Sequence, residues 1–332
     1  MSTQYNNGSI RAVQKIEVAD EEYDQRIDNF LLKRLKNVPK SHIYQLLRSG
    51  QVRVDGKRIR ADYRLQMGNI LRIPPIFSPE KNSAEIRRVP SKFFAFEVLF
   101  EDETLLVINK PEGMAVHGGS GISFGVIEQL RTQNPSWKFL ELVHRLDRET
   151  SGLLLLAKKR AALVELHRQI REGLIHKHYL VMVSGYWSNT VQHVKLTLTK
   201  FATTHGERRV AVVNEKNKND IIKPMLAHTI FRLQKTWKSF SLLDAELKTG
   251  RTHQIRVHLA HLGFPIVGDD KYGDFNLNKQ LARSDCRFQL SRMFLHANTL
   301  QLTHPKTKQS LQLHAPLPKD LQSFVDQLES ID

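Results

Sequence analysis

The stretch Leu142-Val-His-Arg-Leu-Asp-Arg-Glu-Thr-Ser-Gly152 places a dense group of polar side chains directly before the apolar run Leu153-Leu-Leu-Leu-Ala157. Such a run between polar residues predicts a buried strand. Functional groups are commonly carried by loops that rigid elements hold in place, so this junction is a candidate site. The alternative is a solvated turn in which Asp and Thr make only local hydrogen bonds.

Two later segments favour the functional interpretation. Lys177-His-Tyr179 opens a predicted strand, and Thr249-Gly-Arg-Thr-His-Gln-Ile-Arg-Val-His258 runs from a turn into a helix with Thr252 as its expected N-cap. On the alternative interpretation, Tyr179 is a core aromatic residue and Arg256 is a charge on a helix surface.

The pattern of the larger part of the chain is β-rich with few helices, which favours an α+β fold with a large mixed, mainly antiparallel sheet flanked by helices. Short connections argue against a doubly wound parallel sheet. The predicted strands are 97–100, 105–109, 153–158, 179–186, 194–200, 209–213, 225–233, 239–248, 294–302 and 310–314, and the predicted helices are 124–132, 161–172, 252–261 and 320–328.

The composition of the 332 residues points to a polyanionic partner. Lys and Arg number 50 against 34 Asp and Glu, a formal net charge of +16, which suits a nucleic acid or an anionic membrane surface, although charge alone also serves solubility. The single cysteine, Cys286, allows no internal disulfide. With no signal peptide and no apolar run long enough to cross a membrane, a cytoplasmic location is expected.

The basic character is concentrated near the N-terminus. Residues 24–72 carry twelve Lys or Arg against four Asp or Glu. Two short amphipathic helices and a hairpin at Asp55-Gly56 are predicted there, the outline of a small RNA-binding module. We therefore expect a flexible N-terminus at 1–20, this module at 21–73, a proline-bearing linker at 74–92 and a second domain at 93–332.

Taken together, these motifs resemble those of the RluA family of pseudouridine synthases. The matching segments are Asn109-Lys-Pro-Glu-Gly113, His144-Arg-Leu-Asp-Arg-Glu-Thr-Ser-Gly152, Tyr179 in its strand and Gly250-Arg-Thr-His-Gln-Ile-Arg-Val-His258. Arg26-Ile-Asp-Asn-Phe-Leu31 and Gly50-Gln-Val-Arg-Val-Asp-Gly56 resemble an S4 RNA-binding domain of the αL type, with Asn69 in place of a common aspartate.

The resemblance implies that the protein isomerises uridine in RNA by breaking the C1′–N1 bond, turning the base and joining C5 to C1′, without cofactor or metal. Asp147 matches the essential carboxylate, which attacks C1′ or C6 or removes the C2′ proton. Arg256 matches the basic residue that keeps this carboxylate charged. Tyr179 matches the residue that stacks on the target base and handles a proton at C5.

Other matched residues would bind RNA. Arg145 matches the residue that replaces the flipped-out base, with His144, Arg251 and His253 beside it. In the S4 domain, the expected phosphate contacts are Arg26, Lys33, Arg34, Lys40, Arg48 and Arg53.

Residues 115–128 and 141–148 resemble the subgroup that modifies three separate uridines of 23S ribosomal RNA. The expected partner is therefore 23S ribosomal RNA in a large-subunit precursor, bound by a monomer with no membrane contact. A sister group of different ribosomal or transfer RNA specificity, a non-catalytic ribosome-assembly factor and a nucleoside hydrolase are the alternatives. The hydrolase needs two carboxylates, for which Glu149 is the neighbour of Asp147.

Overall fold

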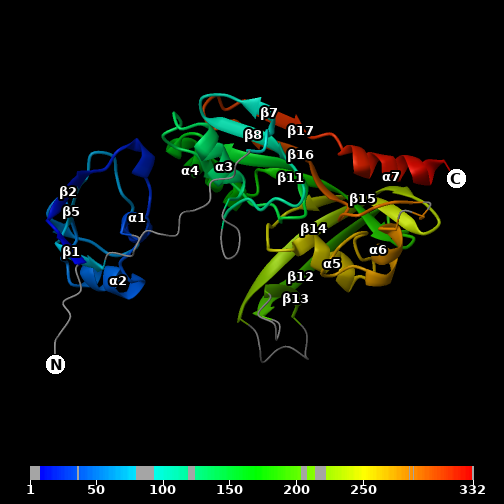
Figure 1. The fold of residues 1–332 in the computed structure, drawn as a ribbon, viewed down its shortest axis with the longest axis horizontal. Helices are drawn as coiled ribbons and strands as arrows, with labels where there is room; N and C mark the ends of the chain where they lie inside the picture. Colours follow the sequence, from blue (N-terminus) through cyan, green and yellow to red (C-terminus); the bar gives the residue numbers. More distant parts are fainter. Residues whose placement is uncertain are drawn as a thin grey trace.

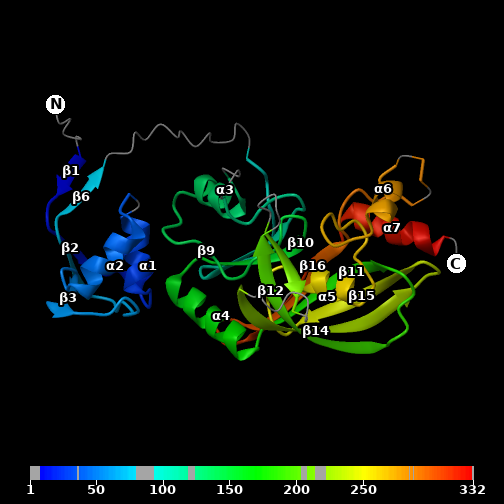
Figure 2. The same cartoon turned by 90° about the horizontal axis from the view of Figure 1, so that it is seen from below.

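The computed structural model describes residues 8–35, 37–79, 93–118, 124–202, 208–213, 222–283, 285–286 and 288–330. These residues form a small N-terminal module and a larger domain built around one long, twisted sheet (Figure 1). Seen from below, helix α4 (Arg160–Glu172) is the part of the larger domain nearest the module (Figure 2). Arg160 at the start of this helix donates a hydrogen bond of 2.6 Å to the carbonyl of Tyr23.

The N-terminal module has the predicted helices and hairpin around its own apolar core. Helices α1 (Ile27–Arg34) and α2 (Lys40–Arg48) share this core with a four-stranded sheet of order β2-β5-β3-β4. The strands are β2 (Gln14–Glu17), β3 (Arg53–Val54), β4 (Lys57–Arg58) and β5 (Ile70–Ile73). Asn69 accepts from the backbone of Gln66 and donates to Asp55 at 2.7 Å, so the asparagine serves this turn without a carboxylate.

The described part of the segment 1–20, which was expected to be flexible, contains two paired strands. Strand β2 pairs with β5, and β1 (Gly8–Arg11) pairs with β6 (Ile76–Pro79), which lies inside the expected linker. The 3-10 turn η1 (Asp20–Glu22) follows β2. Each of these strands pairs with another strand, and the pairing provides hydrogen-bond partners for its backbone N–H and C=O groups. A segment with few apolar side chains can form a strand in this way. Residues 80–92 of the linker lie outside the described residues.

The larger domain confirms the expected mixed, mainly antiparallel sheet. Its main path runs β13-β12-β14-β15-β11-β16-β10-β8-β7, with β17 added on β16 and β9 on β10. The strands are β7 (Glu97–Glu101), β8 (Leu105–Lys110), β9 (Glu141–Leu142), β10 (Ser151–Ala157), β11 (His176–Ser184), β12 (Val191–Ala202), β13 (Arg208–Val212), β14 (Ile222–Thr236), β15 (Phe240–Leu247), β16 (Leu295–Thr303) and β17 (Ser310–His314).

Strand β10 is the apolar run that follows the polar stretch, and it is buried along its whole length. It is antiparallel to β8 on one side, and on the other it is parallel to β16 over Ser151↔His296 and Gly152↔Ala297. Gly152 has φ +108°, and a Cβ built on it would lie 2.3 Å from the carbonyl oxygen of Ala297. The close approach of these two strands therefore requires glycine at this position.

Helices pack against both the centre and the ends of the sheet. Besides α4, they are α3 (Val126–Gln133), α5 (Gln254–His261), α6 (Phe275–Leu281) and α7 (Lys319–Glu329). Helix α4 contributes Leu163 and Leu166 to the main core, whereas α6 and α7 share a second core with Met182 and Phe294. Helix α6 and strand β9 were not expected from the sequence, because each is short. In the described residues, no helix is long and apolar enough to cross a membrane.

Candidate active site

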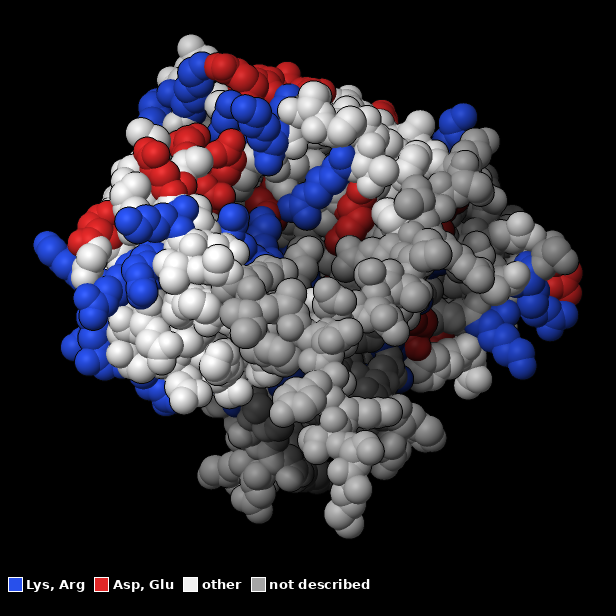
Figure 3. Space-filling view, turned by 60° about the vertical axis from the view of Figure 1, so that its left-hand side comes forward, with Lys and Arg blue, Asp and Glu red and all other residues white. Residues whose placement is uncertain are grey.

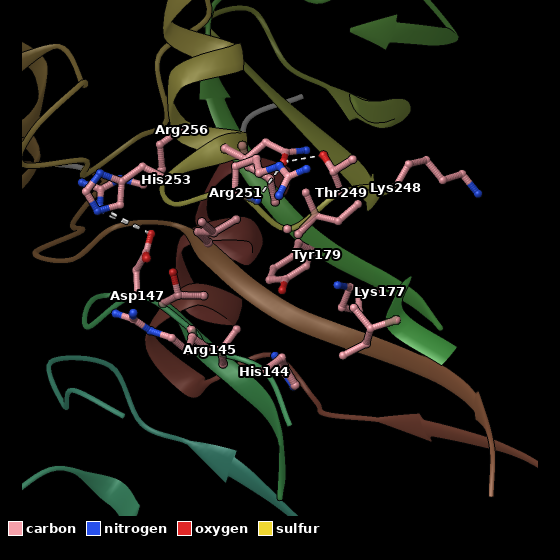
Figure 4. Close-up of a pocket in the computed structure, with 18 of the residues that line it drawn as sticks. His144, Arg145, Asp147, Lys177, Tyr179, Lys248, Thr249, Arg251, His253 and Arg256 are labelled. Carbon is pink, nitrogen blue, oxygen red and sulfur yellow. Dashed lines mark hydrogen bonds and ion pairs between the residues drawn. The ribbon is translucent and has the colours of Figure 1, made fainter. Parts of the chain in front are cut away.

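The polar stretch before β10 forms one wall of a cavity of about 570 Å³. Strand β11, the loop after β15 and the start of α5 provide the other walls (Figure 4). Asp147 is the one acidic side chain among the described residues that line it. Six cationic side chains line it as well, namely Arg145, Arg171, Lys177, Lys248, Arg251 and Arg256. A single carboxylate thus lies in a strongly positive cavity.

Asp147 is partly exposed, at 29% of its side chain, and Figure 4 shows it pointing toward His253. Its Oδ2 atom lies 3.8 Å from Nη1 of Arg256 and 3.9 Å from Nε2 of His253. These are ion-pair distances and too long for hydrogen bonds. The positive guanidinium beside it offsets the charge of the carboxylate while leaving the carboxylate open to the cavity.

Arg256 is held by a second aspartate that was not predicted from the sequence. Its guanidinium, 2% exposed, donates 2.7 Å and 2.6 Å hydrogen bonds to the two oxygens of the fully buried Asp269. It also donates to Asp270 at 2.9 Å and lies over the ring of Tyr272. Burial opposes the charge of Arg256, but Asp269 outweighs this effect and raises the pKa of Arg256, so the guanidinium is a fixed positive charge.

Asp269 is positioned by its own backbone surroundings. One of its oxygens accepts hydrogen bonds from the backbone N–H groups of Lys271 and Tyr272 at 2.8 Å and 3.0 Å. Burial opposes ionisation, yet the hydrogen bonds from Arg256 hold the pKa of Asp269 below its usual range. The preceding Gly268 has φ +78°, and a Cβ there would lie 1.9 Å from the carbonyl oxygen of Arg292, so this turn also depends on glycine.

The loop that carries Asp147 is fixed at its far end by a buried polar group. Ser151 lies 2.9 Å from Nδ1 of His296 and accepts a 2.7 Å hydrogen bond from Arg292. Burial lowers the pKa of His296 to about 4, so its imidazole is neutral. The buried ammonium of Lys110 donates to the carbonyl of Arg148 at 3.0 Å, next to Asp147 in the chain. Both anchors follow Asp147 in the chain, so the C-terminal side of the short loop is tied to neighbouring elements.

Tyr179 lies on β11 and is 5% exposed, which agrees in part with the core interpretation, yet its ring lines the cavity. A β-bulge falls between His178 and Tyr179 where β11 pairs with β16. Burial, together with the charge of Asp147, raises the pKa of Tyr179, so the phenol keeps its proton at neutral pH. Within the described residues, no protein group hydrogen-bonds to its hydroxyl, which leaves that group open to a ligand in the cavity.

The four expected RNA contacts of this domain lie at the cavity, but in different environments. Arg145 is exposed and lies on the Asp147 side (Figure 4). Arg251 is exposed and donates to the carbonyl of Leu226 at 3.1 Å. His144 accepts a hydrogen bond from the backbone of Leu155, and burial with Lys177 nearby lowers its pKa to about 3. Because His144 is neutral and already bonded, it is better suited to holding the loop than to binding phosphate.

The loop before α5 differs from the expectation in its cap. Helix α5 begins at Gln254 with His253 as N-cap in the left-handed region, at φ 52°, so the expected cap at Thr252 is wrong. The buried Gln254 side chain accepts from the backbone N–H of Arg251 and the hydroxyl of Thr249 and donates to the carbonyl of His228. These hydrogen bonds tie the turn before α5 to Thr249 and to β14.

Lys177, Lys248 and Arg171 are further cavity residues that were not singled out. The sequence does hold a signal for Lys177, since alternate residues of a strand share a face and Lys177 stands two positions before Tyr179. No comparable local signal exists for Asp269, because the pairing with Arg256 is made by tertiary structure.

The six expected S4 contacts lie on the helices and first hairpin of the N-terminal module. Arg26 is paired with the buried Asp28, and Lys33 lies 3.3 Å from Glu141 of the larger domain. Arg34, Lys40, Arg48 and Arg53 complete the set. All six are exposed or half-buried. Figure 3 shows Lys and Arg gathered along the left side of the molecule in that view, with Asp and Glu near the upper edge.

In the described ranges, no group of three or more His, Cys, Asp or Glu side chains is arranged to hold a metal ion.

Two family models match this chain, and they define its class as an RNA-modifying enzyme that carries an RNA-binding module. Residues 104–261 match the family model of RNA pseudouridylate synthase, and residues 25–71 match that of the S4 domain. The chain belongs to the RNA pseudouridylate synthase family.

Curated relatives match nearly the whole chain. A protein of Pasteurella multocida is 47% identical over 320 residues, covering 96% of this chain and 94% of its own. A protein of Escherichia coli K12 is 44% identical over 321 residues, covering 96% and 98%. Both relatives carry the name ribosomal large subunit pseudouridine synthase C.

Solved structures agree with the fold. Human RNA pseudouridylate synthase domain containing 1 is 24% identical, with a TM-score of 0.57 over 72% of this chain and 90% of its own. Human RNA pseudouridylate synthase domain containing 4 is 24% identical, with a TM-score of 0.56 over 70% of this chain and 93% of its own.

Proposed function

We propose that this protein isomerises specific uridines of large-subunit ribosomal RNA to pseudouridine, with Asp147 as its catalytic carboxylate. The observation that carries the proposal is the single carboxylate in a cavity lined by six cations. Such a cavity attracts an RNA segment through its phosphates and offers it one acidic group. The names of the curated relatives support the ribosomal substrate.

A cavity with one carboxylate suits an isomerase better than a hydrolase of glycosidic bonds, which generally uses two carboxylates on opposite sides of the bond. Glu149 does not line the cavity, and its side chain is paired with Arg148 at 2.6 Å. Asp147 acts as a carboxylate at C1′ or C6, or as the base for the C2′ proton. Tyr179 stacks on the uracil and handles the proton at C5.

A uridine in folded RNA is reached only after it leaves the stack, at a cost of a few kcal/mol. Arg145 is exposed at the mouth of the cavity and carries a planar cation that fills the vacated position and contacts phosphate. Arg251 and Lys248 face the same cavity and suit the flanking phosphates. Arg145 is therefore assigned to base extrusion, and the other two to positioning of the RNA.

The N-terminal module binds RNA outside the cavity and raises the local concentration of the substrate. We assign phosphate contacts to the expected cations that have no acidic partner in the described residues, namely Arg34, Lys40, Arg48 and Arg53. Arg26 and Lys33 already pair with carboxylates. The protein is proposed to act in the cytoplasm, as a monomer, on three separate uridines of 23S ribosomal RNA in a large-subunit precursor.

The test is to map pseudouridine at nucleotide resolution in ribosomal and transfer RNA from cells that lack this protein. The same cells are complemented with wild type, Asp147→Asn or the control Asp285→Asn. We expect loss of three 23S sites, restored by wild type and by the control but not by Asp147→Asn. The control changes an exposed aspartate outside the cavity lining.

Other outcomes would overturn specific parts of the proposal. Loss of other sites keeps the activity and rejects the three-site specificity. Full restoration by Asp147→Asn rejects the carboxylate assignment. Tight RNA binding without pseudouridine formation at any site favours a non-catalytic assembly factor, whereas release of free uracil from RNA favours a hydrolase.

A further inference from the structure

The hydroxyl group of Tyr272 links a strand of the sheet to the imidazole beside Asp147. The backbone N–H of Val210 on β13 donates to this hydroxyl at 3.0 Å. The same hydroxyl lies 2.8 Å from Nδ1 of His253. The other ring nitrogen of His253 is the one that lies 3.9 Å from Oδ2 of Asp147. A residue outside the cavity lining is thus connected to the carboxylate through a single imidazole ring.

The donor of each hydrogen bond in this series follows from which groups carry a proton. A backbone N–H group can only donate, so Val210 uses a lone pair of the Tyr272 oxygen. The phenol has one proton, and in the described residues Nδ1 of His253 is the acceptor within reach. If Tyr272 donates to Nδ1, that nitrogen is unprotonated, and a neutral imidazole then carries its proton on Nε2. The Nε2–H group consequently faces Asp147.

The surroundings of His253 favour the neutral ring. Burial lowers the pKa of His253, and the charge of Asp147 only partly offsets this effect. The other charged groups that face the ring are Arg256, Lys271 and Asp269.

The backbone of His253 is held in an unusual conformation that aims the ring. A left-handed φ of 52° is strained for a non-glycine residue and persists only where the surroundings impose it. Here the buried Gln254 network fixes the loop on one side, and the Tyr272 hydroxyl fixes the ring on the other.

We propose that Tyr272 is a positioning residue that holds His253 as the Nε2–H tautomer. In this arrangement the Nε2–H group of His253 and the guanidinium of Arg256 both lie beside Oδ2 of Asp147. This inference rests on the proposed function, since it names a residue that positions the surroundings of the same carboxylate.

The first arm of the test observes the tautomer directly in the full chain. The protein is labelled with ¹⁵N-histidine, and long-range ¹H–¹⁵N spectra are recorded for wild type and Tyr272→Phe, with His253→Gln to assign the signal. We expect wild-type His253 to be the Nε2–H tautomer. Tyr272→Phe keeps the ring beneath Arg256 and removes only the hydroxyl, so we expect a mixture with the Nδ1–H form.

The second arm measures pseudouridine formation on ribosomal RNA. We expect Tyr272→Phe to lower kcat about 10- to 100-fold with KM within about 2-fold, because the change misplaces a group without removing an RNA contact. Tyr186→Phe, at an exposed tyrosine, is the matched control and should leave both constants and the spectrum unchanged.

A wild-type His253 signal of the Nδ1–H form overturns the proposal, and this result needs no folded variant. An altered tautomer in Tyr272→Phe with unchanged kcat also overturns it. If the wild type forms no pseudouridine on any RNA, the proposed function fails. The spectra then still decide whether the hydrogen-bond chain exists, so the two failures are distinguishable.

Discussion

The guanidinium of Arg256 lies 3.8 Å from Oδ2 of Asp147, whereas it donates hydrogen bonds of 2.7 Å and 2.6 Å to the two carboxylate oxygens of Asp269. The buried carboxylate of Asp269 thus fixes the guanidinium in a position that faces the partly exposed carboxylate of Asp147. A cation locked in this way keeps its position when substrate enters, so little reorganisation is needed during the reaction. Asp269 therefore fixes the position of the cation that faces Asp147.

Replacing Asp269 with asparagine should destabilise the fold and reduce activity together. The substitution leaves Arg256 buried without its charged partner, which typically costs about 3–5 kcal/mol. Thermal unfolding and pseudouridine formation are the measurements. Asp270→Asn is the control, because Asp270 is 51% exposed and its replacement should cost about 1 kcal/mol or less. Equal effects of the two substitutions would contradict the assignment of Asp269.

Gly152→Ala should prevent the close pairing of β10 with β16. The added methyl group would meet the carbonyl oxygen of Ala297 at 2.3 Å, in addition to the strain of a positive φ. We expect a decrease of more than about 3 kcal/mol in the free energy of unfolding, measured in urea. Gly173→Ala has a similar φ of +73° with open space around it, and it should cost only about 1 kcal/mol. A small effect at Gly152 would mean that the strands can separate.

Acid should destabilise the protein partly through Glu246. Burial opposes ionisation of this side chain, but hydrogen bonds from Lys248, Arg232 and His176 outweigh it and lower the pKa to about 2. A carboxyl whose pKa is lower in the folded state stabilises the fold above its unfolded pKa and loses that contribution as the pH falls toward the folded value. Wild type should therefore lose stability between about pH 5 and pH 2.

The measurement for Glu246 is urea unfolding across this pH range. Glu246→Gln should be less stable than wild type at pH 7 and show a flatter dependence at low pH. Glu97→Gln, at an exposed position on β7, is the control. Parallel curves for wild type and Glu246→Gln would show that the acid sensitivity arises elsewhere.

Neutralising Lys40 and Arg48 together should weaken RNA binding more than it slows the reaction. Removing one phosphate contact should reduce the slope of log K against log salt by about 0.7–0.9. We expect KM to rise about 5- to 20-fold at physiological salt with kcat unchanged. Lys235→Gln is the control, since Lys235 pairs with Glu329 of α7. A fall in kcat with unchanged KM would contradict an anchoring role for the module.

Local patterns predicted much of this structure. The continuous apolar run 153–157 predicted a buried strand, and the helical spacing of apolar residues predicted the amphipathic helices. The order of the motifs indicated the family. The N-terminal strands were missed because their partners are far along the chain, as in Ile16 with Leu71. Three features of the site depend on tertiary contacts that the local sequence does not encode. They are the neutral state of His144, the left-handed backbone of His253 and the hydrogen bonds between Asp269 and Arg256.

Ser151 and His296 are neighbours across β10 and β16, although they stand 145 positions apart in the chain. The C-terminal end of the Asp147 loop is therefore fixed by a residue that the ribosome adds long after the loop itself. A nascent chain that ends before residue 296 contains the whole motif 142–152 but lacks the histidine that contacts Ser151. The placement of this loop thus depends on a late part of the chain as well as on its own local sequence.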